Sequence, residues 1–256
     1  MNPLDWPICV QVILVLIALA GFLFFLSRHA FWKGNRPKNW PRVLMYHHID
    51  PYKEASGMNT PPQLLEKQLQ YFQKRGAKFY TMSELAEAEP HDNMVAITVD
   101  DGYEDNHRYL FPLLRKYKAK ATIYYAPNLK DDRLMNELQM REMVESGLVE
   151  FGAHTMDHVN LLNVPDSIAK TQILQSKEAV EKLTGQPCTS FAYPYGRYGS
   201  AHVKILHKLG FKTACTTKKM IRPLMESPLQ TPRVSTNGQA SMLQFIISLM
   251  NGRYRI

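Results

Sequence analysis

Residues 94–102 read Met-Val-Ala-Ile-Thr-Val-Asp-Asp-Gly, an apolar run that ends in two adjacent carboxylates and a glycine. A short run of this kind, rich in β-branched residues, predicts a strand that is buried on both faces, as in a parallel sheet. Residues 121–125 and 149–153 repeat the pattern, with helix-like segments between them. The alternation predicts an α/β fold whose parallel sheet is covered by helices. A closed barrel and an open doubly wound sheet both fit it.

The remaining elements follow from apolar periodicity, helix caps and turn residues. Further strands are predicted at residues 43–46, 190–193 and 212–216, and helices at residues 60–72, 83–87, 109–117, 135–146, 165–183, 201–209 and 240–250. We find no internal repeat and no low-complexity tract. In a parallel α/β fold of either kind, ligands bind where the strands end.

The composition is that of an ordinary folded protein. Of 256 residues, 45% are hydrophobic and 21% charged, which argues against extensive disorder. The formal net charge is +8, but no nucleic-acid-binding motif accompanies it, so we expect no nucleic-acid partner. The sparse cysteines, Cys9, Cys188 and Cys215, do not form a disulfide framework.

The N-terminal region contains a long apolar run, residues 8–26, with Gln11 as its only strongly polar side chain. At ~1.5 Å per residue a helix of this run spans about 28 Å, close to the roughly 30 Å hydrocarbon core of a bilayer. Trp6 precedes it and Phe31 and Trp32 follow it, as interfacial aromatic residues do. The run therefore predicts a single transmembrane helix.

A cleavable signal peptide is the alternative. The residues before the run include Asp5 and no lysine or arginine, and no A-x-A cleavage site follows it. We therefore expect an uncleaved membrane anchor over residues 1–32, a polar linker over residues 33–41 and a catalytic domain over residues 42–256. The cations that follow the anchor place the domain in the cytoplasm by the positive-inside rule.

The residues suited to catalysis follow two of the predicted strands. Asp100 and Asp101 follow residues 94–99, and His154 and His158 follow residues 149–153. Alone, the aspartates also suit a helix cap, and the histidines suit a surface pair. Together, one carboxylate and two imidazoles at strand ends suit Zn²⁺, with Co²⁺ or Ni²⁺ as alternatives, and leave a position open for water. Asp101 would then bind the metal, and Asp100 would be free to act as a general base.

Three segments resemble the motifs of the polysaccharide deacetylases, carbohydrate esterase family four. Residues 98–102 (Thr-Val-Asp-Asp-Gly), 154–158 (His-Thr-Met-Asp-His) and 191–196 (Phe-Ala-Tyr-Pro-Tyr-Gly) are similar to the first, second and third motifs, in family order. The resemblance covers residues 42–234. It implies a distorted (β/α)7-type barrel, metal ligation by Asp101, His154 and His158, and Asp100 as the base.

The resemblance also implies a substrate-binding part of the site. The backbone N–H of Tyr195, next to Pro194, would help to hold the oxyanion. Ala192 stands where the family's third motif has an arginine, and we expect Arg233 to supply that charge. The segment Leu44-Met45-Tyr46-His47-His48 is similar to the poly-N-acetylglucosamine deacetylases of biofilm systems. This similarity, and the lack of a late leucine–histidine motif, makes His47 the candidate general acid.

These features predict a metal-dependent hydrolase that removes N-acetyl groups from a poly-N-acetylglucosamine-like polysaccharide. The resemblance to the biofilm subgroup predicts that the domain lies outside the cytoplasm. The positive charges that follow the anchor predict the cytoplasmic side instead. An alternative substrate is an acetamido sugar on a lipid carrier, in cell-envelope glycan biosynthesis at the membrane surface. A catalytically silent carbohydrate-binding protein is the alternative from another class. A zinc peptidase is disfavoured because no H-E-x-x-H sequence is present.

Overall fold

The computed structural model describes residues 6–29, 34–130 and 132–252. Its centre is a parallel sheet of eight strands that closes on itself, because β1 pairs with β8 on one side and with β3 on the other. The ring consists of β1 (Arg42–Tyr46), β3 (Met94–Val99), β4 (Ala121–Tyr125), β5 (Val149–Ala153), β6 (Ser190–Ala192), β7 (Thr213–Lys219) and β8 (Thr231–Ser235). The short β2 (Lys78–Tyr80) pairs with β3 outside this ring. The prediction of a seven-stranded barrel is confirmed.

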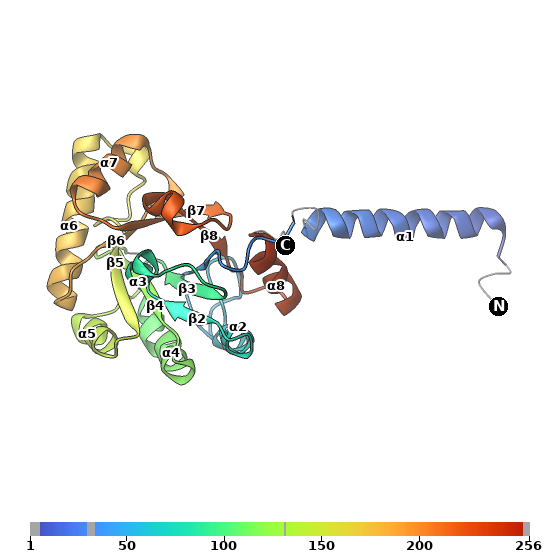
Figure 1. The fold of residues 1–256 in the computed structure, drawn as a ribbon, viewed down its shortest axis with the longest axis horizontal. Helices are drawn as coiled ribbons and strands as arrows, with labels where there is room; N and C mark the ends of the chain where they lie inside the picture. The colour runs from blue at the N-terminus through green and yellow to red at the C-terminus, as the bar shows by residue number, and fades with distance from the viewer. Residues whose placement is uncertain (1–5, 30–33, 131, 253–256) are drawn as a thin grey trace.

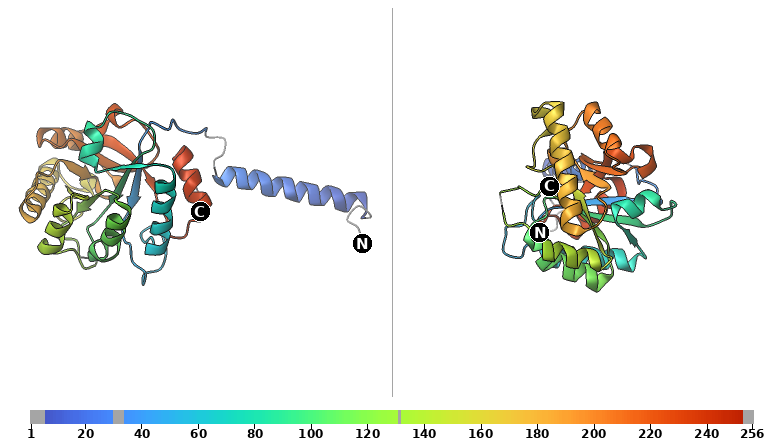
Figure 2. Two further views of the ribbon diagram at one scale, coloured as in Figure 1. Left: turned by 60° about the horizontal axis from the view of Figure 1, so that its bottom comes forward. Right: turned by 90° about the vertical axis from the view of Figure 1, so that its left-hand side faces the viewer.

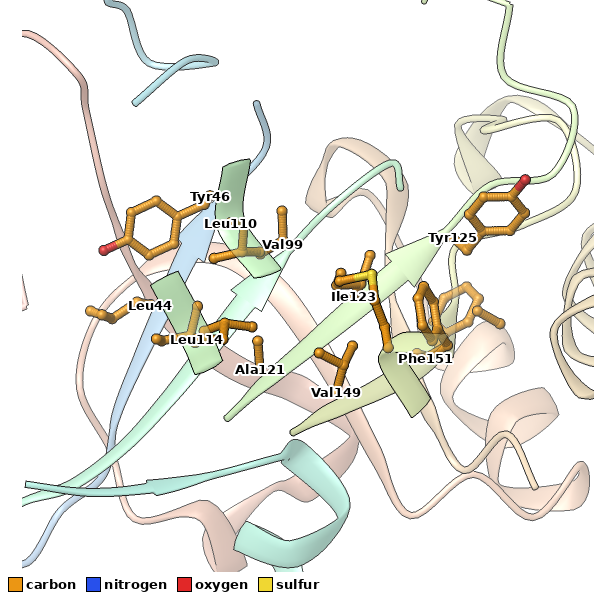
Figure 3. Packing of buried hydrophobic residues seen from close by; sticks show 14 of the residues in the cluster. Leu44, Tyr46, Val99, Leu110, Leu114, Ala121, Ile123, Tyr125, Val149 and Phe151 are labelled. Carbon is orange, nitrogen blue, oxygen red and sulfur yellow. The ribbon is translucent and has the colours of Figure 1, made fainter. Parts of the chain in front are cut away.

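Helices surround the barrel (Figures 1 and 2). They are α2 (Pro62–Lys74), α4 (Phe111–Tyr117), which continues a π-helical turn at Asn106–Leu110, α5 (Glu137–Glu145), α6 (Asp166–Thr184), α7 (Ser200–Lys208) and α8 (Met242–Asn251). Their apolar faces pack on the outward side chains of the strands, and Figure 3 shows Leu114 of α4 near Leu44 and Ala121. Burial of this apolar layer is the main force that holds helices to barrel.

A second, smaller core fills the barrel itself. It contains inward side chains such as Val43, Ala96 and Tyr124, and it is joined by Met82 and Leu85 of α3 (Met82–Glu87). β3 and β4 are therefore buried on both faces over their whole length, which explains their continuous apolar runs in the sequence. Since side chains alternate along a strand, Ala96 and the residues two and four positions after it face inward.

Glu150 of β5 joins α3 to three adjacent strands. Its carboxylate accepts hydrogen bonds from the Ser83 N–H (3.0 Å) and hydroxyl (2.6 Å), from the Thr122 hydroxyl (3.0 Å) and from the Ser190 hydroxyl (2.7 Å). A carboxylate can accept all four because it has two oxygens and no hydrogen to place. This network fixes α3 against the barrel.

Glu150→Gln is expected to lower the free energy of unfolding by about 1–3 kcal/mol. The NH2 group of glutamine replaces one carboxylate oxygen, so the N–H and O–H groups that donate to that oxygen lose their acceptor. Chemical denaturation measures the change. Glu178→Gln on the exposed face of α6 is the matched control, expected to be nearly neutral. Equal stability of the two variants would contradict the role of Glu150.

The N-terminal helix α1 (Ile8–His29) includes the predicted span. Residues Ile8–Leu26 are long and apolar enough to cross a membrane, with a mean hydropathy of 2.9, and none of this segment is buried. The expected interfacial residues Phe31 and Trp32, and the start of the linker, lie outside the described residues. In Figure 1 α8 lies on the side of the barrel from which α1 departs.

Candidate active site and metal centre

The two adjacent aspartates leave β3 in different directions. Asp100 continues the inward alternation of the strand, whereas Asp101 has a φ of 78°, in the left-handed region that non-glycine residues rarely adopt. Both are buried, each 3% exposed. The chain then turns at Gly102, where a Cβ would lie 2.3 Å from the ring of Tyr125, so only glycine fits.

The two histidines of the second motif meet Asp101 at one point. His154 follows β5, and a turn containing two residues of positive φ, Thr155 (59°) and His158 (51°), brings the second imidazole back beside the first. The Nε2 atoms of His154 and His158 lie 3.6 and 3.5 Å from Asp101 Oδ1. The three side chains thus converge, with ligand atoms all within 4.8 Å of one another.

The donor set and its surroundings fit a divalent metal ion. Tetrahedral ligands about 2.1 Å from one ion lie about 3.4 Å apart, close to the separations found. The Nδ1 of His154 donates to the Ala192 carbonyl at 2.7 Å, which leaves the Nε2 lone pair directed at Asp101. Among the residues that the structure describes, the buried Asp101 Oδ1 receives no hydrogen bond. Burial and the neighbouring Asp100 raise the pKa of Asp101 to about 7.

Asp100 is held by Arg233 of β8. The guanidinium donates two hydrogen bonds to the carboxylate, Nη1 to Oδ1 at 2.6 Å and Nη2 to Oδ2 at 2.7 Å. It also donates to the Thr98 hydroxyl and the Thr216 carbonyl, both at 2.9 Å. Burial alone would raise the pKa of Asp100, but the charge and hydrogen bonds of Arg233 hold it well below its usual range. Asp100 is therefore ionised.

Arg233 was expected among the substrate-binding residues and as the source of the charge missing at Ala192. It is 1% exposed, and its guanidinium is directed at Asp100, so it lies behind the carboxylate rather than on a surface that a substrate could touch. Ala192 itself packs inside the barrel and accepts the His154 hydrogen bond through its carbonyl. Its two hydrogen bonds hold the Asp100 carboxylate in one orientation.

His47 follows β1 directly and also lies close to Asp100. Its Nε2 is 3.8 Å from Asp100 Oδ2, and its side chain is 15% exposed. Burial lowers the pKa of His47 to about 4, against the opposing effect of Asp100. The resting imidazole is therefore neutral at pH 7.

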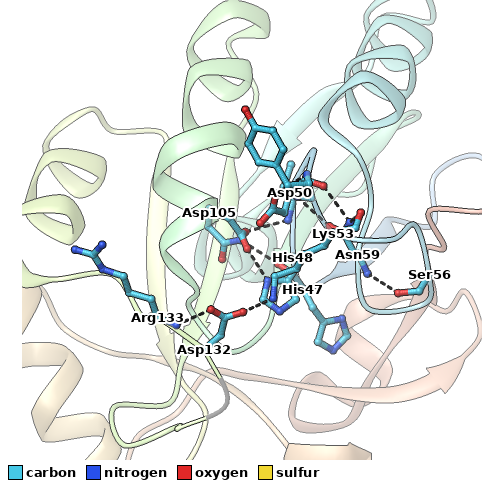
Figure 4. A network of polar contacts seen from close by, with 12 residues as sticks. His47, His48, Asp50, Lys53, Ser56, Asn59, Asp105, Asp132 and Arg133 are labelled. Carbon is cyan, nitrogen blue, oxygen red and sulfur yellow. Dashed lines mark hydrogen bonds and ion pairs between the residues drawn. The ribbon is translucent and has the colours of Figure 1, made fainter.

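The neighbouring His48 has a different environment (Figure 4). It bonds through Nδ1 to Asp105 Oδ2 at 2.5 Å and stacks on Tyr103 with ring centroids 3.7 Å apart. The other Asp105 oxygen accepts the Ile49 N–H at 3.0 Å. His48 thus clamps the loop after β1 to the loop after β3, a contact that sequence reasoning did not find because Asp105 belongs to no recognised motif.

The third motif forms the exposed edge of the site. Tyr195 has a φ of 57°, is 59% exposed, and its ring centroid lies 4.7 Å from that of His158. Pro194 is buried beneath it, and a Cβ at Gly196 would collide with Thr217. Left-handed backbone in non-glycine residues gathers at functional sites because surrounding structure must maintain it. Here Asp101, Thr155, His158 and Tyr195 share that property.

A family model described as polysaccharide deacetylase matches residues 87–214, half of the chain, which includes both aspartates, both histidines and the third motif. The chain belongs to the polysaccharide deacetylase family.

Individual relatives agree with this assignment. The poly-beta-1,6-N-acetyl-D-glucosamine N-deacetylase of Staphylococcus epidermidis is 26% identical over 235 residues, with 79% of this chain and 81% of that protein covered. The Bacillus subtilis protein YxkH is 29% identical over 195 residues, covering 74% and 68%. Among solved structures, the Streptococcus pyogenes deacetylase PplD in complex with acetate superposes with a TM-score of 0.74 at 25% identity, covering 82% of this chain and 98% of PplD.

Proposed function

We propose that this protein is a metal-dependent N-deacetylase that hydrolyses acetamido groups on the N-acetylhexosamine residues of a poly-N-acetylglucosamine-like polysaccharide. The observation that carries the proposal is the convergence of Asp101, His154 and His158 beside a carboxylate, Asp100, that Arg233 keeps ionised. The named Staphylococcus epidermidis relative supports the choice of polymer.

The three convergent side chains would hold the metal ion, Zn²⁺ or a similar ion such as Co²⁺ or Ni²⁺. A bound ion of this kind polarises an acyl oxygen and lowers the pKa of water to roughly 7. Asp100 takes the proton from the water that attacks the acetyl carbon. Arg233 orients Asp100 for this step and keeps it in the carboxylate form that can accept the proton.

Collapse of the tetrahedral intermediate breaks the carbon–nitrogen bond, and the leaving nitrogen takes a proton. We assign this donation to His47. Its imidazole is neutral before the reaction, so it must first receive the proton that the attacking water releases. Asp100 Oδ2, at 3.8 Å from His47 Nε2, carries that proton after the attack. We assign to the Tyr195 N–H, in its left-handed turn beside Pro194, the stabilisation of the developing oxyanion. Acetate and the free amine are the products.

His47→Gln is expected to lower kcat for acetate release by about 100-fold, at the low end of the range for general acids, because glutamine cannot pass on a proton. The KM should change little. Measurement of steady-state kinetics decides the point, with the exposed His207→Gln as control. Wild-type kcat in the His47 variant would remove this residue from the mechanism.

The substrate can be determined by measuring acetate release. Purified full-length protein is incubated with poly-β-1,6-N-acetylglucosamine and, separately, with a lipid-linked acetamido sugar, the alternative that the membrane anchor favours. We expect chelator-sensitive release from the polymer. Release from the lipid-linked sugar alone would favour the alternative, and no release from either would favour a silent carbohydrate-binding protein.

His154→Ala is expected to lose bound metal and deacetylase activity together, because one of three protein ligands is removed. Elemental analysis of the purified variant measures the metal independently of catalysis. His207→Ala, an exposed histidine on α7, is the matched control and should retain the metal. Full metal content in the His154 variant would contradict the assignment of ligands.

We also propose that residues 1–32 anchor the protein in the cell membrane as a single pass, with residues 33–41 as linker and 42–256 as the catalytic domain. The apolar span Ile8–Leu26 supports the anchor. Positive charge after the span favours the cytoplasmic face, and the polymer substrate favours the outer face. Reporter fusions at the C-terminus that are active on only one side of the membrane distinguish the two.

A further inference from the structure

A cavity of about 530 Å³ lies at the end of the barrel where β1 and β3 begin. Its walls include the first residue of β1, Arg42, and the first two residues of β3, whereas the candidate active site lies where these strands end. The apolar side of the cavity comes from α2 and α8, through residues such as Tyr71, Phe72 and Leu249. The cavity is thus separate from the catalytic centre.

The segment that follows the membrane anchor forms part of the cavity wall. The Arg36 N–H donates to the Met250 carbonyl of α8 at 2.8 Å, and the Arg42 guanidinium donates to the carbonyls of Pro37 (2.7 Å) and Leu249 (2.9 Å). These bonds fix residues 36–42 against the barrel. The first residue of the cavity wall, Asn35, follows the last residue of the apolar span, Leu26, by nine positions in the chain.

Three further cations surround the cavity, and the backbone holds their segments together. The N–H of Asn93 donates to the Lys38 carbonyl at 3.3 Å, and its side-chain amide donates to the Arg75 carbonyl at 3.2 Å. Arg36, Lys38 and Arg75 thus line one opening together with Arg42. No aspartate or glutamate is among the described residues that line the cavity, and the neighbouring Asp92 interacts electrostatically with Arg42.

Several lysines and arginines elsewhere on the protein are neutralised by a neighbouring carboxylate. Lys53, Lys116 and Lys177, for example, each form an ion pair with a carboxylate. Within the described ranges, Arg36, Lys38 and Arg75 form none, and the buried Nε of Arg36 has no hydrogen-bond acceptor.

We propose that this cavity binds the headgroup phosphate of an anionic phospholipid in the membrane that holds the anchor. An opening that combines arginine side chains with aromatic and aliphatic walls suits a phosphate attached to an acyl chain. Basic side chains next to a transmembrane segment interact favourably with anionic lipid at the surface. The inference rests on the proposed anchor and is independent of the proposed deacetylation.

Lipid binding at this cavity fixes the orientation of the domain. The N-terminal ends of β1 and β3 then face the bilayer, and the catalytic end faces away from it. A strand of five residues, such as β1, rises on the order of 15 Å between the two ends. The active site is thereby directed at a polymer away from the surface, and not at sugars held at headgroup level.

Hydrogen–deuterium exchange of the full chain in lipid nanodiscs tests the proposal. Nanodiscs of phosphatidylcholine are compared with nanodiscs that also contain phosphatidylglycerol. We expect phosphatidylglycerol to slow exchange in residues 34–42 and 71–77, and added salt to weaken this protection. The triple variant Arg36→Gln, Lys38→Gln, Arg75→Gln should lose it, whereas the charge-matched variant Lys170→Gln, Lys182→Gln, Lys208→Gln should retain it.

The contrary outcomes are equally distinct. Identical exchange of the wild type in both lipids, or retained protection in the cavity variant, overturns the proposal. Protection of the loops 51–58, after β1, and 195–199, in the third motif, at the opposite end of the barrel shows the opposite orientation and also overturns it. Protection by inorganic phosphate in phosphatidylcholine nanodiscs shows a site for free phosphate and not for a membrane surface. Unchanged exchange of the barrel strands in the variant verifies that it is folded.

Discussion

Replacement of Arg233 by methionine is expected to lower the free energy of unfolding by about 3–5 kcal/mol, because it leaves the buried Asp100 without a partner. Arg233 is 1% exposed and bonds both oxygens of Asp100, so no water replaces the lost donors. Removal of one member of a buried ion pair lowers the free energy of unfolding by far more than the intact pair contributes to it. The reason is that the remaining charge stays unpaired in a medium of low dielectric. Urea denaturation at pH 7 measures the loss.

Two further variants identify the cause. Arg141→Met removes an exposed arginine paired with Glu137 on one helix and should change stability by less than about 0.5 kcal/mol. The double variant Asp100→Asn, Arg233→Met should lose less stability than the sum of its single variants, because neither charge remains unpaired. Additive losses would show that Arg233 acts through packing alone.

Asp100→Asn is expected to lower kcat for acetate release by about 10²–10⁴-fold, because an amide cannot accept the proton of the attacking water. The metal content should remain that of the wild type, since Asp101 and the two histidines converge without Asp100. Kinetics and elemental analysis are measured on the same preparation, below the melting temperature of the variant. Asp100→Asn should thus lose activity and keep its metal, whereas the ligand variant His154→Ala should lose both activity and metal.

Asp166→Asn is the matched control, because Asp166 is exposed at the start of α6, and we expect it to retain kcat. A kcat near that of the wild type for Asp100→Asn would refute its assignment as the base. Loss of metal in Asp100→Asn would instead indicate that Asp100 is a metal ligand. The two results separate a proton acceptor from a ligand.

The fold was predictable where a strand has apolar residues on both faces. β3, β4 and β5 coincide with the three apolar runs, because strands that are buried on both faces consist mostly of apolar residues. Two strands were not predicted. β2 has three residues and lies outside the ring, and β8 contains Pro232 and the charged Arg233, both atypical of a central strand. Their pairing depends on tertiary contacts that no local pattern encodes.

The site was predictable to the extent that its residues lie in short motifs. Asp101, His154 and His158 follow apolar strands, and parallel strands bring their ends to one edge. The bond between Asp100 and Arg233 joins residues 133 positions apart, and it depends on the order in which the barrel closes. The motif position at Ala192 indicated a missing charge, but the sequence alone could not place Arg233 behind the carboxylate.

The exclusion of β2 from the ring decides which strand ends are neighbours. β1 pairs directly with β3, and Tyr46 is in register with Val99, so the next residues, His47 and Asp100, are one interstrand spacing apart, about 4.8 Å. An eighth strand inserted between them would double that separation to about 9.6 Å, too far for a proton to pass directly. The circumference of the barrel, and not only the identity of the two side chains, thus makes the proposed proton transfer feasible.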